Sequence, residues 1–308
     1  MVIVFGSINV DFIGQVPSLP RSGETVLGSG LMVAPGGKGA NQALAARRAG
    51  AQVQLVGAVG SDQLAQTALS LLSEAGVDLA SVAVRADHTG CALILVDRFG
   101  ENSIAVLPGA NDAVRAEQLR TLKLGGGDVL VLQQEVPADE VRAAAADAHR
   151  RGARVILNCA PFFPADRSLF DFVSVLVANE NEAIALASHV LRQRLDEEAA
   201  MSRLAKELQL VGILTLGERG SVAFDGDTVA RVAALPIVPL DTVGAGDTYV
   251  GVLAARLEAG EPLASAMQHA SVAASLTCTV RGAQPAMPSR DIIDRELSTL
   301  RAGNTAEE

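Results

Sequence analysis

A short glycine-rich stretch, Asp241 to Gly251, carries residue types that could bind and transfer a phosphate. Gly244 and Gly246 lie two positions apart, and glycine permits backbone conformations in which successive N–H groups converge on an anion. The apolar residues that follow recur at helical spacing: Val250, Leu253, Ala254 and Leu257. The turn therefore lies at a helix N-terminus, whose free N–H groups suit a phosphate or a developing negative charge. Asp247 in this turn is either a helix cap or a positioned base.

This stretch matches neither of two common nucleotide-binding loops. A dinucleotide-binding fingerprint needs a third glycine where Tyr249 stands, and a P-loop needs a Gly-Lys-Ser/Thr that does not follow. Taken alone, Gly-x-Gly-Asp is more typical of a capped turn than of a catalytic loop. A second glycine-rich stretch changes this interpretation.

That second stretch is Gly36-Gly37-Lys38-Gly39-Ala40-Asn41-Gln42, which leads into a predicted helix, Ala43–Ala49, with Gly50 just past its end. Glycines at a helix entry let a small polar ligand reach the backbone, and Lys38 and Asn41 add side-chain donors. The Gly-x-x-Gly spacing also fits the clamp of an RNA-binding KH loop. The acidic chain and the lack of a small βααβ module make that alternative a minor one.

Strands and helices alternate along the chain and predict the scaffold of these loops. The predicted strands are Val2–Phe5, Gln52–Val59, Asp128–Gln133, Arg154–Asn158, Phe172–Ala178 and Val211–Leu216, and the clearest helices are Asp62–Gly76 and Ala138–Arg151. Repeated β–α alternation indicates an α/β fold with a mostly parallel sheet covered by helices on both faces. The chain length favours one large domain.

Polar residues collect where these strands end. They are Asn9, Asp11, Glu135, Asn179, Glu182 and Thr215. Ligands of open α/β sheets bind at the carboxyl ends of the strands, so a shared site explains this set better than separate turn caps.

Two segments do not fit the main alternation of strands and helices. In residues 12–35 the apolar runs are short and are interrupted by Pro and Gly. Cys91–Asp97 and Ser103–Leu107 are two strand-like runs that predict a hairpin. Both segments could form a small β flap.

Composition excludes several classes of function. The formal net charge is −10, and the 308 residues include no Trp and one Tyr, which argues against nucleic-acid or anionic-membrane binding. Three distant cysteines make a disulfide framework or a Cys-x-x-Cys metal site improbable. No stretch approaches a membrane-spanning length, and the N-terminus lacks the basic residues of a signal peptide. We therefore expect a soluble, cytoplasmic protein.

The chain resembles the PfkB (ribokinase-like) family of carbohydrate kinases from Gly6-Ser7-Ile8-Asn9-Val10-Asp11 to Arg281-Gly282-Ala283-Gln284-Pro285. Gly36–Asn41 is similar to the first family signature and Asp241–Asp247 to the second. Ser103–Asn111, with Pro-Gly-Ala-Asn, is similar to the ribokinase branch. The resemblance implies a sheet of about nine strands and a β lid built from two insertions, near residues 12–33 and 89–107. It also implies a homodimer in which the two lids clasp each other.

The resemblance further implies roles for individual residues. Asn9 and Asp11 would bind sugar hydroxyls, Glu135 would contact the sugar from the far side, and the pocket would be lined by Gly37, Lys38, Gly39, Ala40 and Asn41. Asp247 would be the catalytic base, beside an anion hole of Gly244, Ala245 and Gly246. Asn179 and Glu182 resemble the family's Asn-x-x-Glu, linked to phosphate and Mg²⁺. ATP would be held by Thr215, Leu216, Gly217, Glu218, Arg219 and Gly220, with Ser271 near the adenine. A monovalent cation, K⁺, would bind Asp241 and the backbone around Val243, Thr277, Val280, Gly282 and Ala286.

Three positions depart from the family pattern. Ala65 stands where the family often has glycine, Asn158-Cys159-Ala160-Pro161 replaces Asn-Pro-Ala-Pro and is followed by Phe162-Phe163, and Thr248-Tyr249-Val250 replaces Thr-Phe-Asn. None removes a proposed catalytic group, but all could alter which sugar fits. We expect ATP-dependent phosphorylation of a pentose, with ribose first and 2-deoxyribose, fructose or a nucleoside as alternatives. A catalytically idle sugar- or nucleotide-binding protein is the competing class, although it would have no use for Asp247.

Overall fold

The computed structural model describes residues 1–304 and contains two β-sheets. The larger has nine strands in the order β13-β12-β11-β10-β9-β8-β1-β4-β5. In chain order their bounds are β1 Val2–Phe5, β4 Val53–Gly60, β5 Asp78–Arg85, β8 Val129–Leu132, β9 Arg154–Asn158, β10 Val175–Asn179, β11 Val211–Thr215, β12 Ser221–Asp225 and β13 Thr228–Val232. Along this order, every neighbouring pair from β11 to β5 is parallel. Strand β12 is antiparallel to both of its neighbours, β11 and β13. The sheet is therefore mostly parallel, as predicted.

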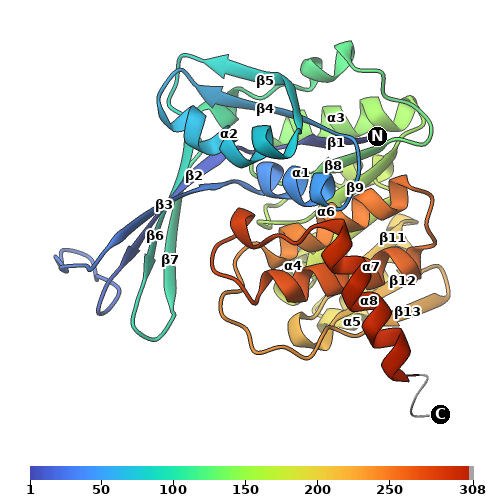
Figure 1. Cartoon of the computed structure of the whole chain (residues 1–308). Coiled ribbons are helices and arrows are strands. Elements are labelled where there is room, and N and C mark those ends of the chain that lie inside the picture. Colours follow the sequence, from blue (N-terminus) through green and yellow to red (C-terminus); the bar gives the residue numbers. More distant parts are fainter. Residues whose placement is uncertain (305–308) are drawn as a thin grey trace.

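Helices cover both faces of this sheet (Figure 1). One face packs on α1 Lys38–Arg48, α2 Leu64–Ala75, α6 Ala245–Glu258, α7 Leu263–Thr277 and α8 Arg290–Asn304. The other packs on α3 Ala138–Arg150, α4 Glu180–Val190 and α5 Glu197–Leu208, and on the 3₁₀ turns η1 Gly109–Ala113, η2 Ala116–Thr121 and η3 Arg167–Phe172. Strand β1 shows why the strands are apolar throughout: Val2 and Val4 face the first core, and Ile3 and Phe5 face the second.

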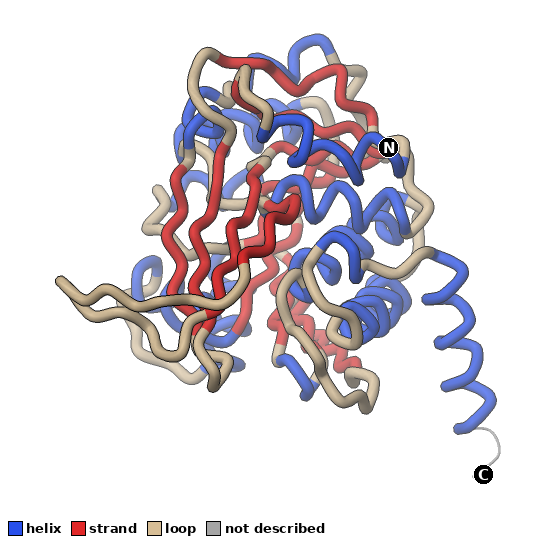
Figure 2. The backbone as a smooth tube through the Cα atoms, turned by 60° about the vertical axis from the view of Figure 1, so that its left-hand side comes forward, coloured by secondary structure: helices blue, strands red, loops and turns tan. Residues whose placement is uncertain are grey.

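The smaller sheet has the order β3-β2-β6-β7, with β2 Asn9–Gln15, β3 Leu31–Gly36, β6 Gly90–Val96 and β7 Asn102–Leu107. Strands β2 and β6 are parallel, and the two outer pairings are antiparallel, including the predicted hairpin of β6 and β7. The sheet projects from the body of the molecule (Figure 1), and the loops at its tip reach farthest from the helices (Figure 2). Both predicted insertions thus contribute strands to one sheet.

The structure corrects several predicted boundaries. Helix α1 begins at Lys38, five residues before the predicted start, because Gly37 adopts a φ of 88° and turns the chain directly into the helix. Asn9 and Asp11, which follow the end of β1 in the sequence, belong to a further extended strand, β2. Strands β5, β12 and β13 were not predicted, since none shows a long apolar run.

Among the described residues, no helix has the length and apolar character needed to cross a membrane. The polar sequence of residues 302–308 is typical of a frayed tail. Helix α8 instead continues through Asn304, and residues 305–308 lie outside the described residues.

Candidate active site

Asp247 lies in the first turn of α6, directly after the Gly244–Gly246 turn. Gly244 has a φ of 80°, a conformation that non-glycine residues rarely adopt, and it lets the chain enter the helix sharply. A Cβ added to Gly246 would meet no atom within 4 Å in residues 1–304, so the backbone here borders open space. The Asp247 side chain is only 8% exposed. The turn thus places a buried carboxylate beside accessible amides at a helix N-terminus.

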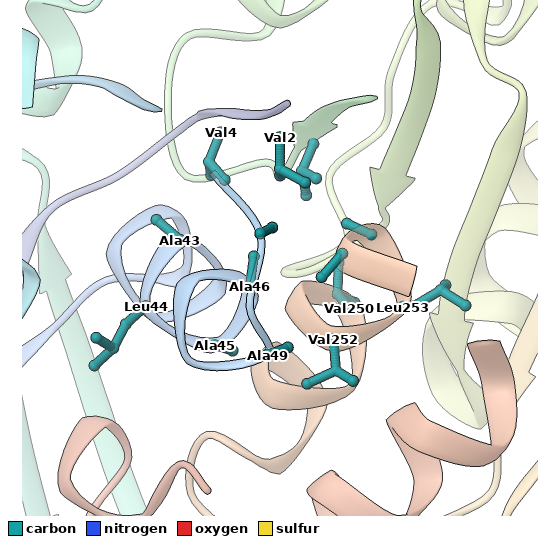
Figure 3. Packing of buried hydrophobic residues seen from close by; sticks show 14 of the residues in the cluster. Val2, Val4, Ala43, Leu44, Ala45, Ala46, Ala49, Val250, Val252 and Leu253 are labelled. Carbon is teal, nitrogen blue, oxygen red and sulfur yellow. The ribbon is translucent and has the colours of Figure 1, made fainter. Parts of the chain in front are cut away.

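Helix α1 approaches α6 and supplies hydrogen-bond donors to this carboxylate. Asn41 Nδ2 donates to Asp247 Oδ2 over 2.9 Å, and Gln42 Nε2 donates to Asp247 Oδ1 over 2.9 Å. Figure 3 shows the packing behind these contacts, where Ala43 and Ala46 of α1 and Val250 of α6 lie near Val2 and Val4 of β1. Leu253 of α6 belongs to the same hydrophobic cluster. The two glycine-rich stretches therefore meet at one carboxylate, although Asn41 and Asp247 are 206 positions apart in the chain.

The two predicted sugar contacts on β2 differ in their surroundings. Asn9 is 3% exposed and its Oδ1 accepts from Asn111 Nδ2 over 2.7 Å, so it helps anchor β2 to η1. The Asp11 carboxylate lies over Gly36 of β3 and accepts no hydrogen bond from residues 1–304. Burial raises the pKa of Asp11 to about 6, and the neighbouring carboxylates Glu135 and Asp247 add to the rise. Asp11 is thus a carboxylate without a protein partner, suited to accept hydroxyl groups.

Glu135 closes the other side of this pocket and also caps α1. Its Oε2 accepts from Ser7 Oγ over 2.6 Å and from the Lys38 amide over 3.1 Å. The Gly39 amide donates to Ser7 Oγ, and the Ala40 amide donates to Ser7 O. Ala40 is fully buried, so it supports the turn and offers no side chain to a ligand. Oε1 is the Glu135 atom that remains for a sugar.

Lys38 lies among four carboxylates from distant parts of the chain. Burial lowers its pKa, but the charges of Asp247, Glu135, Glu182 and Asp11 oppose burial, and the resulting pKa lies above its ordinary value. The charges of all four acids act on this one ammonium, which indicates that the acids lie around Lys38. Acids predicted to bind sugar (Asp11, Glu135), to act as the base (Asp247) and to lie near phosphate (Glu182) therefore surround the Lys38 ammonium.

Asn179 and Glu182 form a reciprocal capping box at the start of α4. Asn179 Oδ1 accepts from the Glu182 amide, and the Asn179 amide donates to Glu182 Oε2, both over 2.9 Å. Burial raises the pKa of Glu182, and the negative charge of Asp247 raises it further. One carboxylate oxygen of Glu182 is thus engaged in the cap, and the other remains for the pocket. Among residues 1–304, no group of three or more His, Cys, Asp or Glu side chains could by itself hold a metal ion.

The predicted nucleotide loop continues from the same rim. Thr215 ends β11 directly beside Asn179 at the end of β10, and Leu216, Gly217, Glu218, Arg219 and Gly220 form the turn η4 Gly217–Arg219 and its flanks. Arg219 pairs with Glu180 over 2.6 Å and with Glu197 over 3.1 Å, which holds the loop against α4 and α5. Ser271 is 4% exposed and its Oγ lies 3.4 Å from Ser221 Oγ, to which Tyr249 donates.

Asp241 and Gly282, two of the predicted cation residues, lie in two turns that contact each other. Asp241 Oδ1 accepts from the Val243 amide over 3.0 Å, and Oδ2 accepts from the Gly282 amide over 2.8 Å. Ala283 packs on Gly244, since a Cβ at Gly244 would lie 2.7 Å from Ala283 Cβ. Thr277 is the last residue of α7, Val280 lies in the turn that follows, and Ala286 ends η5 Gln284–Ala286. The Asp241 carboxylate thus joins the glycine turn to the turn at Gly282.

Several further residues that the sequence did not predict complete the site. They are Ser7, Gln42, Asn111, Gln133, Asn158 and Gln284, all fully or nearly fully buried. Gln42 directly follows Asn41, and Gln133 ends a predicted strand, so the sequence shows that both residues are close to predicted site residues. Their orientation toward Asp247 depends on long-range packing and has no local signal.

Residues 1–290 match the family described as pfkB family carbohydrate kinase. The ribokinase of Bacillus subtilis (strain 168) is 34% identical over 301 residues, which cover 96% of this chain and 99% of the relative. The deoxyribokinase of Salmonella typhi is 31% identical over 308 residues, covering 96% and 98%. The solved structure of the Arabidopsis thaliana ribokinase complexed with ribose and ATP superposes with a TM-score of 0.85 and 29% identity, covering 96% of this chain and 97% of the other. The fold, the two glycine-rich stretches and these similarities agree, and the chain belongs to the pfkB family of carbohydrate kinases.

Proposed function

We propose that this chain transfers the γ-phosphate of ATP to the primary hydroxyl of D-ribose. The observation that carries the proposal is the buried Asp247 carboxylate, held by Asn41 and Gln42 at the N-terminus of α6 and next to the open backbone at Gly246. A base beside an anion-binding turn is what phosphoryl transfer to an alcohol requires, since the protein mainly positions the groups and stabilises charge. Ribokinases and a ribokinase complex with ribose and ATP among the similar proteins support the choice of sugar and phosphate donor.

In this mechanism Asp247 accepts the proton of the primary hydroxyl as its oxygen attacks the γ-phosphorus. The bond from that phosphorus to the β,γ-bridging oxygen breaks, and ADP leaves. The free amides at the start of α6, around Gly246, stabilise the charge on the transferring group. Asp11, Glu135 Oε1 and the Lys38 ammonium bind the hydroxyl groups at the other end of the sugar. These paired polar contacts offset the cost of removing the sugar from water.

We further propose that the reaction uses Mg²⁺ and K⁺. Magnesium would neutralise the triphosphate, with Glu182 as the available protein carboxylate and phosphate oxygens and waters as the remaining ligands. The Asp241 carboxylate fits a monovalent cation, because the N–H groups of Val243 and Gly282 use only part of its acceptor capacity. Arg219, Thr215 and Ser271 would surround the nucleotide. We expect the reaction to take place in the cytoplasm, where ATP is available.

The small sheet is proposed to act as a lid and as the surface of a homodimer. Cross-strand pairing places Met32, Ile13, Ile94 and Ile104 in one row on the face of the sheet that also carries Asp11. Met32 is 48% exposed and Ile104 is 54% exposed. An exposed apolar row next to a polar pocket is suited to cover the sugar and to pack against the same row of a second copy. Hydrogen exchange in residues 9–36 and 90–107 should therefore slow when ribose binds.

The decisive experiment measures ADP release with a panel of ribose, 2-deoxyribose, fructose, other hexoses and nucleosides. Turnover with ribose well above the other sugars supports the proposal. Preference for 2-deoxyribose would agree with the similarity to the deoxyribokinase. Nucleosides stay in the panel because an apolar cavity of about 360 Å³, whose lining includes Pro137, Pro161, Phe163 and Leu169, adjoins Glu135 and could accept a base. No turnover with any compound, despite sugar binding, would favour the idle binding protein.

A further inference from the structure

A chain of buried amide side chains extends from Asp247 in two directions. Gln42 Nε2 donates to Asp247 Oδ1, and Gln42 Oε1 accepts from Gln133 Nε2 over 2.6 Å. On the other side, Asn41 Nδ2 donates to Asp247 Oδ2, and Asn41 Oδ1 accepts from Gln284 Nε2 over 3.1 Å. We call these the Gln133 arm and the Gln284 arm. Each oxygen of Asp247 is thus held by an amide that is itself held by a glutamine.

The charge of Asp247 sets the direction of every amide in both arms. A carboxylate only accepts hydrogen bonds, so Gln42 and Asn41 must turn their NH₂ groups toward it. Their oxygens then point away from Asp247, and Gln133 and Gln284 must in turn present NH₂ groups to those oxygens. The second hydrogen of Gln42 Nε2 is also engaged, with Asn158 Oδ1 over 3.1 Å. No amide of the two arms can flip without setting two acceptors against each other.

Two oxygen atoms at the outer ends of the arms lack partners. Gln133, Gln284 and Gln42 are each 0% exposed, and among residues 1–304 the buried atoms Gln133 Oε1 and Gln284 Oε1 accept no hydrogen bond. A buried acceptor without a partner destabilises a protein, and an apolar side chain of similar size would avoid this cost. Glutamine at both positions is therefore poorly explained by stability alone. It is explained if the NH₂ groups are needed to direct the amides that hold Asp247.

We propose that Gln42, Gln133 and Gln284 are positioning residues that fix the plane of the Asp247 carboxylate for proton transfer. This inference rests on the proposed role of Asp247 as the base. Two of the four acceptor positions of the carboxylate are used by Asn41 and Gln42, and two remain for the substrate hydroxyl. Loss of one arm lets the carboxylate rotate about χ2. Proton transfer depends on the alignment of donor and acceptor, so misplacement lowers turnover.

The test compares Gln→Met variants, which keep side-chain length and remove the amide. We expect Gln42→Met to lower kcat about 10–100-fold and to change the sugar KM less than about threefold. Gln133→Met should lower kcat less, because it acts through Gln42. The double variant of the same arm should match Gln42→Met alone. Gln133→Met combined with Gln284→Met should lose at least the product of the two single effects, since each arm holds its own oxygen.

Gln54→Met is the matched control, because Gln54 is also a buried glutamine but bonds to Ser81 on β5, away from the pocket. Thermal unfolding of every variant separates loss of fold from loss of alignment. Wild-type turnover in Gln42→Met, or kcat losses of Gln42→Met and Gln133→Met that simply multiply, would overturn the proposal. An inactive wild-type chain would instead overturn the proposed function, so the two failures are distinguishable.

Discussion

Gly251 of α6 and Gln42 of α1 approach so closely that a Cβ on Gly251 would lie 2.5 Å from the Gln42 carbonyl oxygen. The same Cβ would lie 2.7 Å from Ala45 Cβ and 2.9 Å from the Ala46 nitrogen. Gly251 stands one helical turn after Asp247, and Gln42 directly follows Asn41. The absence of a side chain at Gly251 is therefore what brings the donors of α1 within reach of the carboxylate.

Gly251→Ala should force α1 and α6 apart, because the clash is with backbone that cannot rotate away. We expect a loss of about 1–3 kcal/mol in the free energy of unfolding and a lower kcat. Chemical denaturation and steady-state kinetics measure the two effects. Gly125→Ala is the control, since its added Cβ would come no closer than 3.9 Å to Arg151 O. Wild-type kcat in Gly251→Ala would show that the helix spacing is not critical.

Asp247→Asn should abolish transfer while ribose binding largely survives. Removal of a general base typically lowers the rate about 10²–10⁴-fold, and the amide cannot accept the hydroxyl proton. ADP release measures turnover, and calorimetry measures sugar affinity. Asp225→Asn, at the exposed end of β12, is the control for the same chemical change. Near wild-type turnover in Asp247→Asn would remove Asp247 from the mechanism.

Sugar affinity should fall as pH decreases through about 6, because burial raises the pKa of Asp11 to about 6 and the protonated group is a weaker acceptor. A drop from pH 7 to pH 5 leaves about a tenth of Asp11 ionised, so the sugar Kd should rise about tenfold. In Asp11→Asn the affinity should be low, with this pH dependence absent. A Kd in the wild type that does not change over this range would contradict the role of Asp11.

The same shift predicts a pH-dependent effect of Asp11→Asn on stability. The folded pKa lies above the unfolded value, so the folded state binds more protons between about pH 4 and pH 6 and loses stability as the pH rises through that range. At pH 8 the ionised group is destabilising, and Asp11→Asn should raise the free energy of unfolding by ~1–3 kcal/mol. At pH 4 the variant should show no gain. Denaturation at both pH values tests this, and an equal gain at both would contradict it.

Potassium should raise turnover more than it changes sugar affinity. An ion at Asp241 would hold the turn at Gly282 against the glycine turn and orient the amides near Gly246 before the phosphate arrives. Assays in potassium, sodium and a bulky organic cation at equal ionic strength keep screening constant. Asp241→Asn should remove the difference between the ions. Equal turnover of the wild type in all three salts would leave Asp241 as a link between the two turns through its bonds to Val243 and Gly282.

Ile104→Asp should convert a homodimer to a monomer, because it places a charge in the apolar row of the small sheet. Light scattering coupled to size-exclusion chromatography measures the mass directly. Val229→Asp is the control, since Val229 is similarly exposed at 52% but lies on β13 of the central sheet. A wild-type chain that is monomeric at all concentrations would rule out the dimer.

The sequence alone determined the elements whose signals are local. Apolar runs alternating with helical patterns predicted the parallel sheet, because strands buried on both faces are apolar at every position. The glycines around Gly37 and Gly244 predicted sharp entries to helices, and Asp247 stood out as the carboxylate in such an entry. Polar residues after successive strands predicted the rim that includes Thr215 and Asn179, since parallel strands end at one edge.

Only the tertiary structure decided which side chains at that rim stabilise the fold and which remain for a ligand. Glu135 caps a helix that begins almost 100 residues earlier, Asn9 anchors a strand to η1, and Asp11 is left without a partner. Gln133 and Gln284 reach Asp247 only through Gln42 and Asn41. These roles depend on the direction of hydrogen bonds between residues far apart in sequence. That direction is set by the packing of α1, α6 and the central sheet, and no local pattern of residues encodes it.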